Sequence, residues 1–160
     1  MTTAVTVRWL GSTRFLGLPS SGPPIPINFL PEDSLPPRET YAGPMPAGPE
    51  GPTPGPKPTE LLLIAAGACT GLDIVSLLGK QRVEFTGLEI EVRGERATDW
   101  PRVFTDIEVV YRLAAAPTAL PHLERAARLS MEKYCSVSLS LSARKSFRCE
   151  VVPDRGGPSS

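Results

Sequence analysis

Two of the three cysteines lie where a pair of thiols could carry redox chemistry. Cys69 sits in the middle of an apolar run from Leu61 to Leu78, and Cys135 follows a second helix-like stretch. A thiol buried on a helix, with a second thiol available elsewhere in the chain, suggests thiol redox chemistry. The third cysteine, Cys149, lies on the apolar face of a predicted strand, so we expect it to be an inert core residue.

Two predicted helices must position these thiols. Pro58 suits the first turn of one helix, Glu60 complements its dipole, and Gly79 is its predicted C-cap. The second helix opens at Pro121, and an apolar stripe on it predicts the buried face. The members of that stripe are Leu120, Leu123, Ala127, Met131 and Tyr134. The segment 136–141, which follows Cys135, fits either a strand or a short helix.

The rest of the chain reads as strands and a proline-rich loop. Alternation predicts strands at 3–10, 14–18, 87–94, 103–113 and 147–152, and a weak edge strand at 25–29. Most of the 19 prolines fall between Pro19 and Pro58, which predicts a loop over 19–57 that acts as a linker or as a lid near the site. A chain of 160 residues is then expected to form one domain over 1–152, with a tail at 153–160.

Composition narrows the classes of function. The net charge is zero, so no basic surface argues for a nucleic-acid partner. The chain begins without a basic and then apolar leader, and the cysteine count is odd, so we expect a reducing cytoplasm and no disulfide scaffold. Asp73 and two glycines interrupt the apolar run, which favours a buried helix over a membrane span. The sequence shows no metal-ligand cluster and no phosphate-binding glycine loop, so no cofactor or metal is expected.

The helix that carries Cys69 is apolar on every face, and such a helix must be covered on every face. The other predicted elements cover about half of such a cylinder. A second copy of the chain is expected to cover the other half, in an obligate homodimer.

The neighbours of Cys69 do not favour a thiolate. Asp73 lies one helical turn further on, and a like charge there raises the pKa of the thiol, as burial does. A reactive Cys69 is therefore expected to need a cation from elsewhere in the fold. The candidates are Arg14 in the predicted hairpin and Arg38 in the proline-rich loop.

Several segments resemble the OsmC/Ohr family, the osmotically inducible and organic hydroperoxide resistance proteins. Pro58–Leu78 is similar to the central helix of that family, and Glu132–Val137 to the segment with its second cysteine. Trp9, Phe15–Gly17 and Pro101–Thr105 resemble the YhfA-like branch. The resemblance covers residues 5–152. It implies an α+β fold in which two chains intertwine, sheets wrap two buried central helices, and two active sites lie at the dimer interface.

The resemblance also implies roles for the thiols. In the peroxidase members the first cysteine attacks an organic hydroperoxide and the second resolves the sulfenic acid as a disulfide. By position, Cys69 is expected to be peroxidatic and Cys135 resolving, with a small dithiol or a lipoyl protein as reductant. Arg14 falls near the position of the site arginine in Ohr proteins, and Arg38 precedes the helix as in OsmC proteins proper.

The chain departs from the family pattern at one position. The peroxidase members have a glutamate directly after the helix-opening proline, where this chain has Thr59, and Glu60 comes one residue later. Each residue of a helix adds about 100° of rotation. Glu60 lies nine residues before Cys69, so it is expected roughly on the opposite face of the helix. A site role and a helix-dipole role both stay open for it. The alternative function is a non-catalytic thiol redox sensor, or a protein of the same fold that binds a small apolar ligand.

Overall fold

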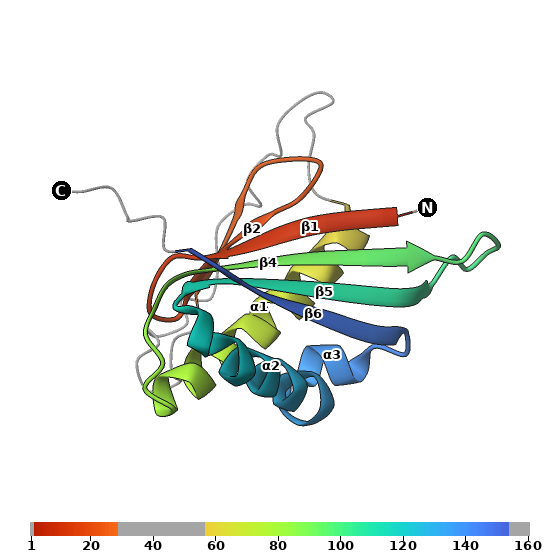
Figure 1. Ribbon diagram of the computed structural model, residues 1–160. Helices are drawn as coiled ribbons and strands as arrows, with labels where there is room; N and C mark the ends of the chain where they lie inside the picture. The colour runs from red at the N-terminus through yellow and green to blue at the C-terminus, as the bar shows by residue number, and fades with distance from the viewer. Residues whose placement is uncertain (1, 29–56, 154–160) are drawn as a thin grey trace, which may run out of the picture.

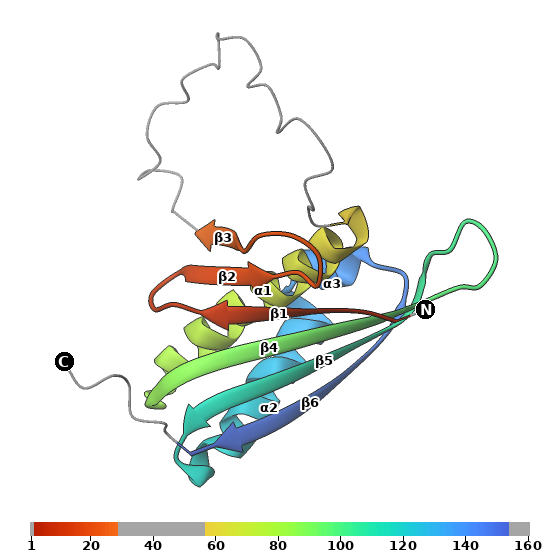
Figure 2. The ribbon, with the colours of Figure 1, turned by 90° about the horizontal axis from the view of Figure 1, so that it is seen from above.

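A six-stranded sheet with three helices on one face forms the body of the protein (Figures 1 and 2). The computed structural model describes residues 2–28 and 57–153. In chain order, the strands and main helices are β1 (Thr2–Trp9), β2 (Arg14–Leu18), β3 (Ile25–Asn28), α1 (Pro58–Lys80), β4 (Phe85–Arg96), β5 (Phe104–Ala115), α2 (Leu120–Leu129), α3 (Ser136–Ser140) and β6 (Arg144–Val152). A 3₁₀ turn, η2 (Pro117–Ala119), precedes α2, and a π-helical turn, η3 (Ser130–Tyr134), follows it.

The strand order is β3-β2-β1-β4-β5-β6, so β3 and β6 are the two edges. Neighbouring strands are antiparallel except for β5 and β6, which run parallel. A parallel pair needs a long crossover connection, and α2, η3 and α3 supply it. This crossover carries Cys135 across the same face of the sheet that α1 covers. Pro26 lies in edge strand β3, as the sequence predicts.

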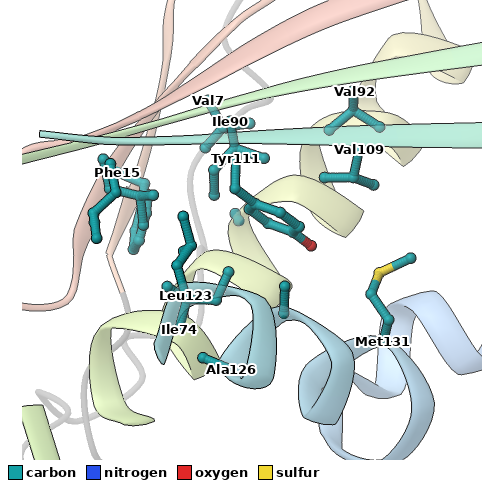
Figure 3. Packing of buried hydrophobic residues seen from close by; sticks show 14 of the residues in the cluster. Val7, Phe15, Ile74, Ile90, Val92, Val109, Tyr111, Leu123, Ala126 and Met131 are labelled. Carbon is teal, nitrogen blue, oxygen red and sulfur yellow. The ribbon is translucent and has the colours of Figure 1, made fainter. Parts of the chain in front are cut away.

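The two faces of the sheet differ in polarity. Side chains such as Val7, Ile90 and Tyr111 point toward the helices and meet Ile74 and Leu123 in one core (Figure 3). On the other face, ion pairs run between strands: Arg112–Glu91 at 2.9 Å, Arg148–Glu108 at 2.9 Å and Arg8–Glu89 at 3.1 Å. Antiparallel sheets with one solvated face have this alternation. Among the described residues, the apolar core therefore lies on the helix side of the sheet.

Helix α1 approaches the sheet closely because glycines face it. A Cβ atom added to Gly67 would lie 2.9 Å from the Cγ2 atoms of both Val7 and Val92. The opposite face of α1 is open, and Leu61 and Leu62 there are 43% and 39% exposed. By length and composition α1 could cross a membrane, but a core helix of a folded domain has the same composition. In this structure one side of α1 is the centre of the core.

The observed helices differ from the predicted ones at their ends. Helix α1 continues through Gly79 to Lys80, and the left-handed residue that follows is Arg82, with φ of 56°, so the predicted C-cap at Gly79 is wrong. The ambiguous segment after Cys135 is the short helix α3. Tyr134 was expected in the buried stripe but is 50% exposed, because the π-helical turn changes the helical phase before it.

A buried carboxylate ties the connection after β2 to the first turn of α1. Glu60 is fully buried, and its oxygens accept hydrogen bonds from the Ser20 amide at 2.9 Å, the Lys57 amide at 2.8 Å and the Ser21 hydroxyl at 2.6 Å. The Ser20 hydroxyl donates a further bond. Burial alone would raise the pKa of Glu60, but these donors lower it from 4.5 to about 2. Glu60 thus anchors the segment that leads into β3.

The glycine contact gives a matched pair of variants. We expect Gly67→Ala to lower the free energy of unfolding by about 1–3 kcal/mol, since the new methyl group would overlap two stiff valines. Gly79→Ala lies in the same helix with nothing within 4 Å of the added atom, and should raise stability by up to about 1 kcal/mol. Urea unfolding followed by circular dichroism measures both. Equal effects of the two substitutions would contradict the close contact.

The Glu60 anchor gives a pH-dependent prediction. Glu60→Gln should lower the free energy of unfolding by about 2 kcal/mol at neutral pH, because charge-assisted hydrogen bonds are lost. The folded-state pKa lies below the ordinary value of 4.5, so this stabilisation is present above pH 4.5 and is lost as pH falls toward 2. The difference between wild type and variant should shrink over that range in urea unfolding. A constant difference would rule the anchor out, and Glu84→Gln at an exposed position is the control.

Candidate active site

An apolar hollow of about 780 Å³ lies beside α1, between edge strand β3 and the turn that leads to Cys135. Most of its lining is aliphatic. The apolar lining residues are Ile25, Ile27, Leu61, Ile64, Ala65, Ala68 and Leu72, and the others are Thr13, Cys69, Asp73, Ser76, Tyr134 and Ser136. Three parts of the chain therefore meet around Cys69: the segment from Thr13 to β3, α1, and the segment around Cys135. Cys69 provides the thiol that faces the hollow.

The structure brings the two predicted thiols together. Cys69 is partly buried on the fourth turn of α1, and Cys135 is fully buried directly after η3. The Cys135 amide donates to the Ser130 carbonyl at 2.9 Å, and the Cys135 Sγ accepts from the Ser138 amide at 3.2 Å. The Cys135 thiol in turn forms a hydrogen bond with Cys69. Both cysteines are free thiols in this arrangement.

Hydrogen bonding makes Cys69 the more acidic thiol of the pair. The bond from the Cys135 thiol lowers the pKa of Cys69, burial raises it, the Val137 amide lowers it, Asp73 raises it, and the Ser136 hydroxyl lowers it. The net result is a pKa well below the ordinary value for cysteine. The pKa of Cys135 is raised, first by its bond to Cys69 and then by burial. One thiol is thus suited to attack and the other to stay protonated.

This balance bears on the expectation that Cys69 needs a cation. Asp73 and burial do raise the pKa of Cys69, as expected, but hydrogen bonds outweigh them, first the bond from the Cys135 thiol and then those from Val137 and Ser136. The groups that shift this pKa include no cation in the part of the chain that the structure describes. Within the described residues, neutral donors thus lower the pKa of Cys69, and a further contribution from an arginine stays a prediction.

The predicted arginines and Glu60 are not gathered around Cys69. In β2, Phe15 and Gly17 face α1, so Arg14 points to the opposite side of the sheet, where its guanidinium donates to the Leu10 carbonyl at 3.2 Å. Arg38 lies outside the described residues. Glu60 is bonded to serines and backbone, as described above, and does not line the hollow. Catalytic roles for these three residues stay predictions.

Cys149 lies apart from the pair. It sits on β6 opposite Tyr111 of β5 and packs against the edge of the core. Burial, followed by the nearby charge of Glu124, raises the pKa of Cys149 to about 12. An un-ionised thiol of this kind is unreactive, in line with the core role predicted from the sequence.

The residues of α1 around Cys69 differ in whether they line the hollow. Ala65 and Leu72 line it, but Ala66 is buried against the sheet and Leu62 faces outward, because the hollow lies to one side of Cys69. The sequence analysis missed Ser136 and the β3 side chains altogether. The only local signal for Ser136 is its position next to Cys135 in a serine-rich stretch.

Known proteins match this chain over most of its length. Residues 49–150 match the family model described as OsmC-like protein. Protein YhfA of Escherichia coli (strain K12) is 33% identical over 135 residues, which cover 84% of this chain and 86% of that protein.

Solved structures have the same fold. A hypothetical protein from Aquifex aeolicus VF5 is 26% identical with a TM-score of 0.53, over 92% of this chain and 96% of that chain. An OsmC-like hydroperoxide resistance protein from Jannaschia sp. CCS1 is 14% identical with a TM-score of 0.53, over 87% of this chain and 84% of that chain. The match to the family model, the similarity to YhfA and the shared α+β fold together show that this chain belongs to the OsmC-like family.

Proposed function

We propose that the protein is a thiol-dependent peroxidase that reduces organic hydroperoxides through Cys69 and Cys135. One observation carries the proposal: an acidified Cys69 lies in an apolar hollow and is hydrogen-bonded to a second, protonated thiol. A cysteine that only fills space in a core does not need hydrogen-bond donors to its sulfur. In a structural disulfide the two sulfurs would be bonded to each other, whereas Cys69 and Cys135 are free thiols. A nucleophilic thiol with a resolving partner needs both features.

The first step is attack by the Cys69 thiolate on the outer oxygen of the hydroperoxide. A sulfur–oxygen bond forms, the peroxide oxygen–oxygen bond breaks, and the leaving alkoxide takes up a proton to become an alcohol. Cys69 is oxidised by two electrons to the sulfenic acid, and the peroxide is reduced. Charge that develops on the leaving oxygen is stabilised by donors such as the Ser136 hydroxyl, an effect that is stronger where water is excluded. An added contribution from Arg14 or Arg38 stays part of the prediction.

The second step closes a disulfide. The Cys135 sulfur attacks the Cys69 sulfur, the sulfur–oxygen bond breaks, and water leaves with the proton of the Cys135 thiol. A small dithiol or a lipoyl protein then reduces the disulfide and is itself converted to a disulfide. No metal, flavin or haem takes part in this proposed cycle.

The hollow favours alkyl or fatty hydroperoxides over hydrogen peroxide. Its side walls are aliphatic residues of α1 and β3, and its volume of about 780 Å³ is in the range of small-molecule sites. Burial of an alkyl chain contributes about 0.8 kcal/mol for each methylene group. The same hollow is what favours the alternative function, in which the protein binds a small apolar ligand or reports on peroxide without turnover.

We further propose that the protein is an intertwined homodimer in which two copies of α1 are buried against each other. The outward face of α1 is apolar, and Leu61, Leu62, Tyr134 and Leu139 are exposed in the single chain. A second copy would cover this face and close the hollow over Cys69. A cytoplasmic location stays a prediction from the sequence.

The mechanism predicts different failures for the two cysteines. Cys69→Ser should abolish turnover of cumene hydroperoxide with excess dithiothreitol. Cys135→Ser should permit one fast oxidation, followed by over-oxidation of Cys69 seen by mass spectrometry. Because the pKa of Cys69 is lowered, its thiolate persists at pH values where an ordinary thiol is already protonated. The rate of the first oxidation should therefore stay constant down to such pH values and fall only when the Cys69 thiolate itself becomes protonated. Peroxide consumption by Cys69→Ser at the wild-type rate would refute the mechanism. A stoichiometric reaction of the wild-type protein without turnover would favour a redox sensor. No reaction of the wild-type protein, together with a bound apolar ligand, would favour a ligand-binding protein.

The dimer is tested by sedimentation. Wild-type protein at micromolar concentration should sediment as a dimer, and Leu61→Glu should dissociate or unfold it because a charge would be placed in the buried interface. Leu10→Glu, at a large exposed residue outside α1, is the matched control. A well-folded wild-type monomer would rule the dimer out.

A further inference from the structure

A carboxylate close to Cys69 is bonded to the turn that precedes Cys135. Asp73 lies four residues after Cys69 on α1, so the two side chains share one face of the helix. Its Oδ2 accepts a hydrogen bond of 2.7 Å from the hydroxyl of Ser130, which is fully buried. The two ends of this bond therefore belong to the two segments that carry the two thiols.

Ser130 also holds Cys135 through the backbone. Its carbonyl accepts the Cys135 amide at 2.9 Å, which is the bond between residues five apart that defines a π-helical turn. Such turns are rare and are frequently found at functional sites. Met131, next in the turn, is buried and points from the turn toward the sheet (Figure 3). The position of Cys135 is thus set by a turn whose first residue is bonded to Asp73.

Asp73 opposes the acidity of Cys69. Its charge raises the pKa of the neighbouring thiol, and burial raises the pKa of Asp73 itself. A carboxylate at this place is unfavourable for a nucleophilic thiolate unless it does something else. The bond to Ser130 is the compensating interaction that the structure provides.

We propose that Asp73 and Ser130 form a positioning pair that holds the π-helical turn η3, which precedes Cys135, against α1. The Cys135 sulfur is thereby placed to close a disulfide with Cys69. Neither residue is a reacting group. The inference rests on the Cys69–Cys135 disulfide of the proposed function, and it does not depend on which oxidant forms that disulfide.

The test is the equilibrium between the protein and dithiothreitol. In this exchange the sulfur–sulfur bond of oxidised dithiothreitol breaks, a Cys69–Cys135 bond forms, and the two protons and two electrons lost by the protein thiols reduce the reagent. The full chain is equilibrated with known ratios of reduced and oxidised dithiothreitol, alkylated, and measured by mass spectrometry. The pKa of Cys69 is measured for every variant from thiolate absorbance, and each equilibrium constant is corrected for it.

The variants separate the hydrogen bond from the charge. Ser130→Ala and Asp73→Ala both remove the bond and should lower the constant for disulfide formation roughly tenfold. Asp73→Asn keeps an oxygen that can accept from Ser130, so its constant should stay near that of wild type while the pKa of Cys69 falls. The Ser130→Ala/Asp73→Ala double variant should be no worse than either single variant. Ser146→Ala, at an exposed position on β6, is the control and should change nothing.

Several outcomes would overturn the proposal. It fails if Ser130→Ala leaves the constant within twofold of wild type, if Asp73→Asn loses as much as Asp73→Ala, or if wild type forms no Cys69–Cys135 disulfide. If Ser130→Ala does not fold, the comparison of Asp73→Asn with Asp73→Ala still decides. A wild type that forms the disulfide with dithiothreitol but never consumes hydroperoxide would refute the proposed peroxidase and leave the positioning pair intact.

Discussion

The close approach of α1 to the sheet is the contact on which the rest of the structure depends. Gly67 and Gly71 let the helix lie against Val7, Ile90 and Val92, and this fixes the rotation of α1 about its own axis. The rotation in turn decides which residues face the core and which face the hollow. Cys69 lies on the border between the two, where a thiol is partly covered by protein and still open to a small molecule.

Two opposing interactions set the pKa of Cys69. Cys135 and the residues just after it bring donors to the Cys69 sulfur, first the Cys135 thiol, and Asp73 brings a charge that acts in the opposite direction. The resulting acidity of Cys69 is the difference between these opposing effects. A site built this way is adjusted by hydrogen bonds from one short segment, and that segment also supplies the second thiol.

Local sequence patterns predict most of the fold but less of the site. Alternation identifies β1, β2 and edge strand β3, and the choice of Cys69 and Cys135 follows from residue type and from resemblance. The end of α1 is missed because the left-handed residue that follows the helix is Arg82, which no pattern marks. The acidity of Cys69 is missed because its donors, such as the Val137 amide, come from a turn distant in sequence. Backbone donors carry no signature in residue types.

The hollow has one stiff side and one that is held less firmly. Its floor is α1, a helix of 23 residues fixed by the core. Its far wall is β3, a strand of four residues that includes a proline and, among the described strands, pairs with β2 alone. Edge ladders of this kind open with low free energy and exchange their amide hydrogens early. The depth of the hollow is thus set by the helix, while its width can adapt, so chain length in a bound molecule should be tolerated more readily than bulk next to Cys69.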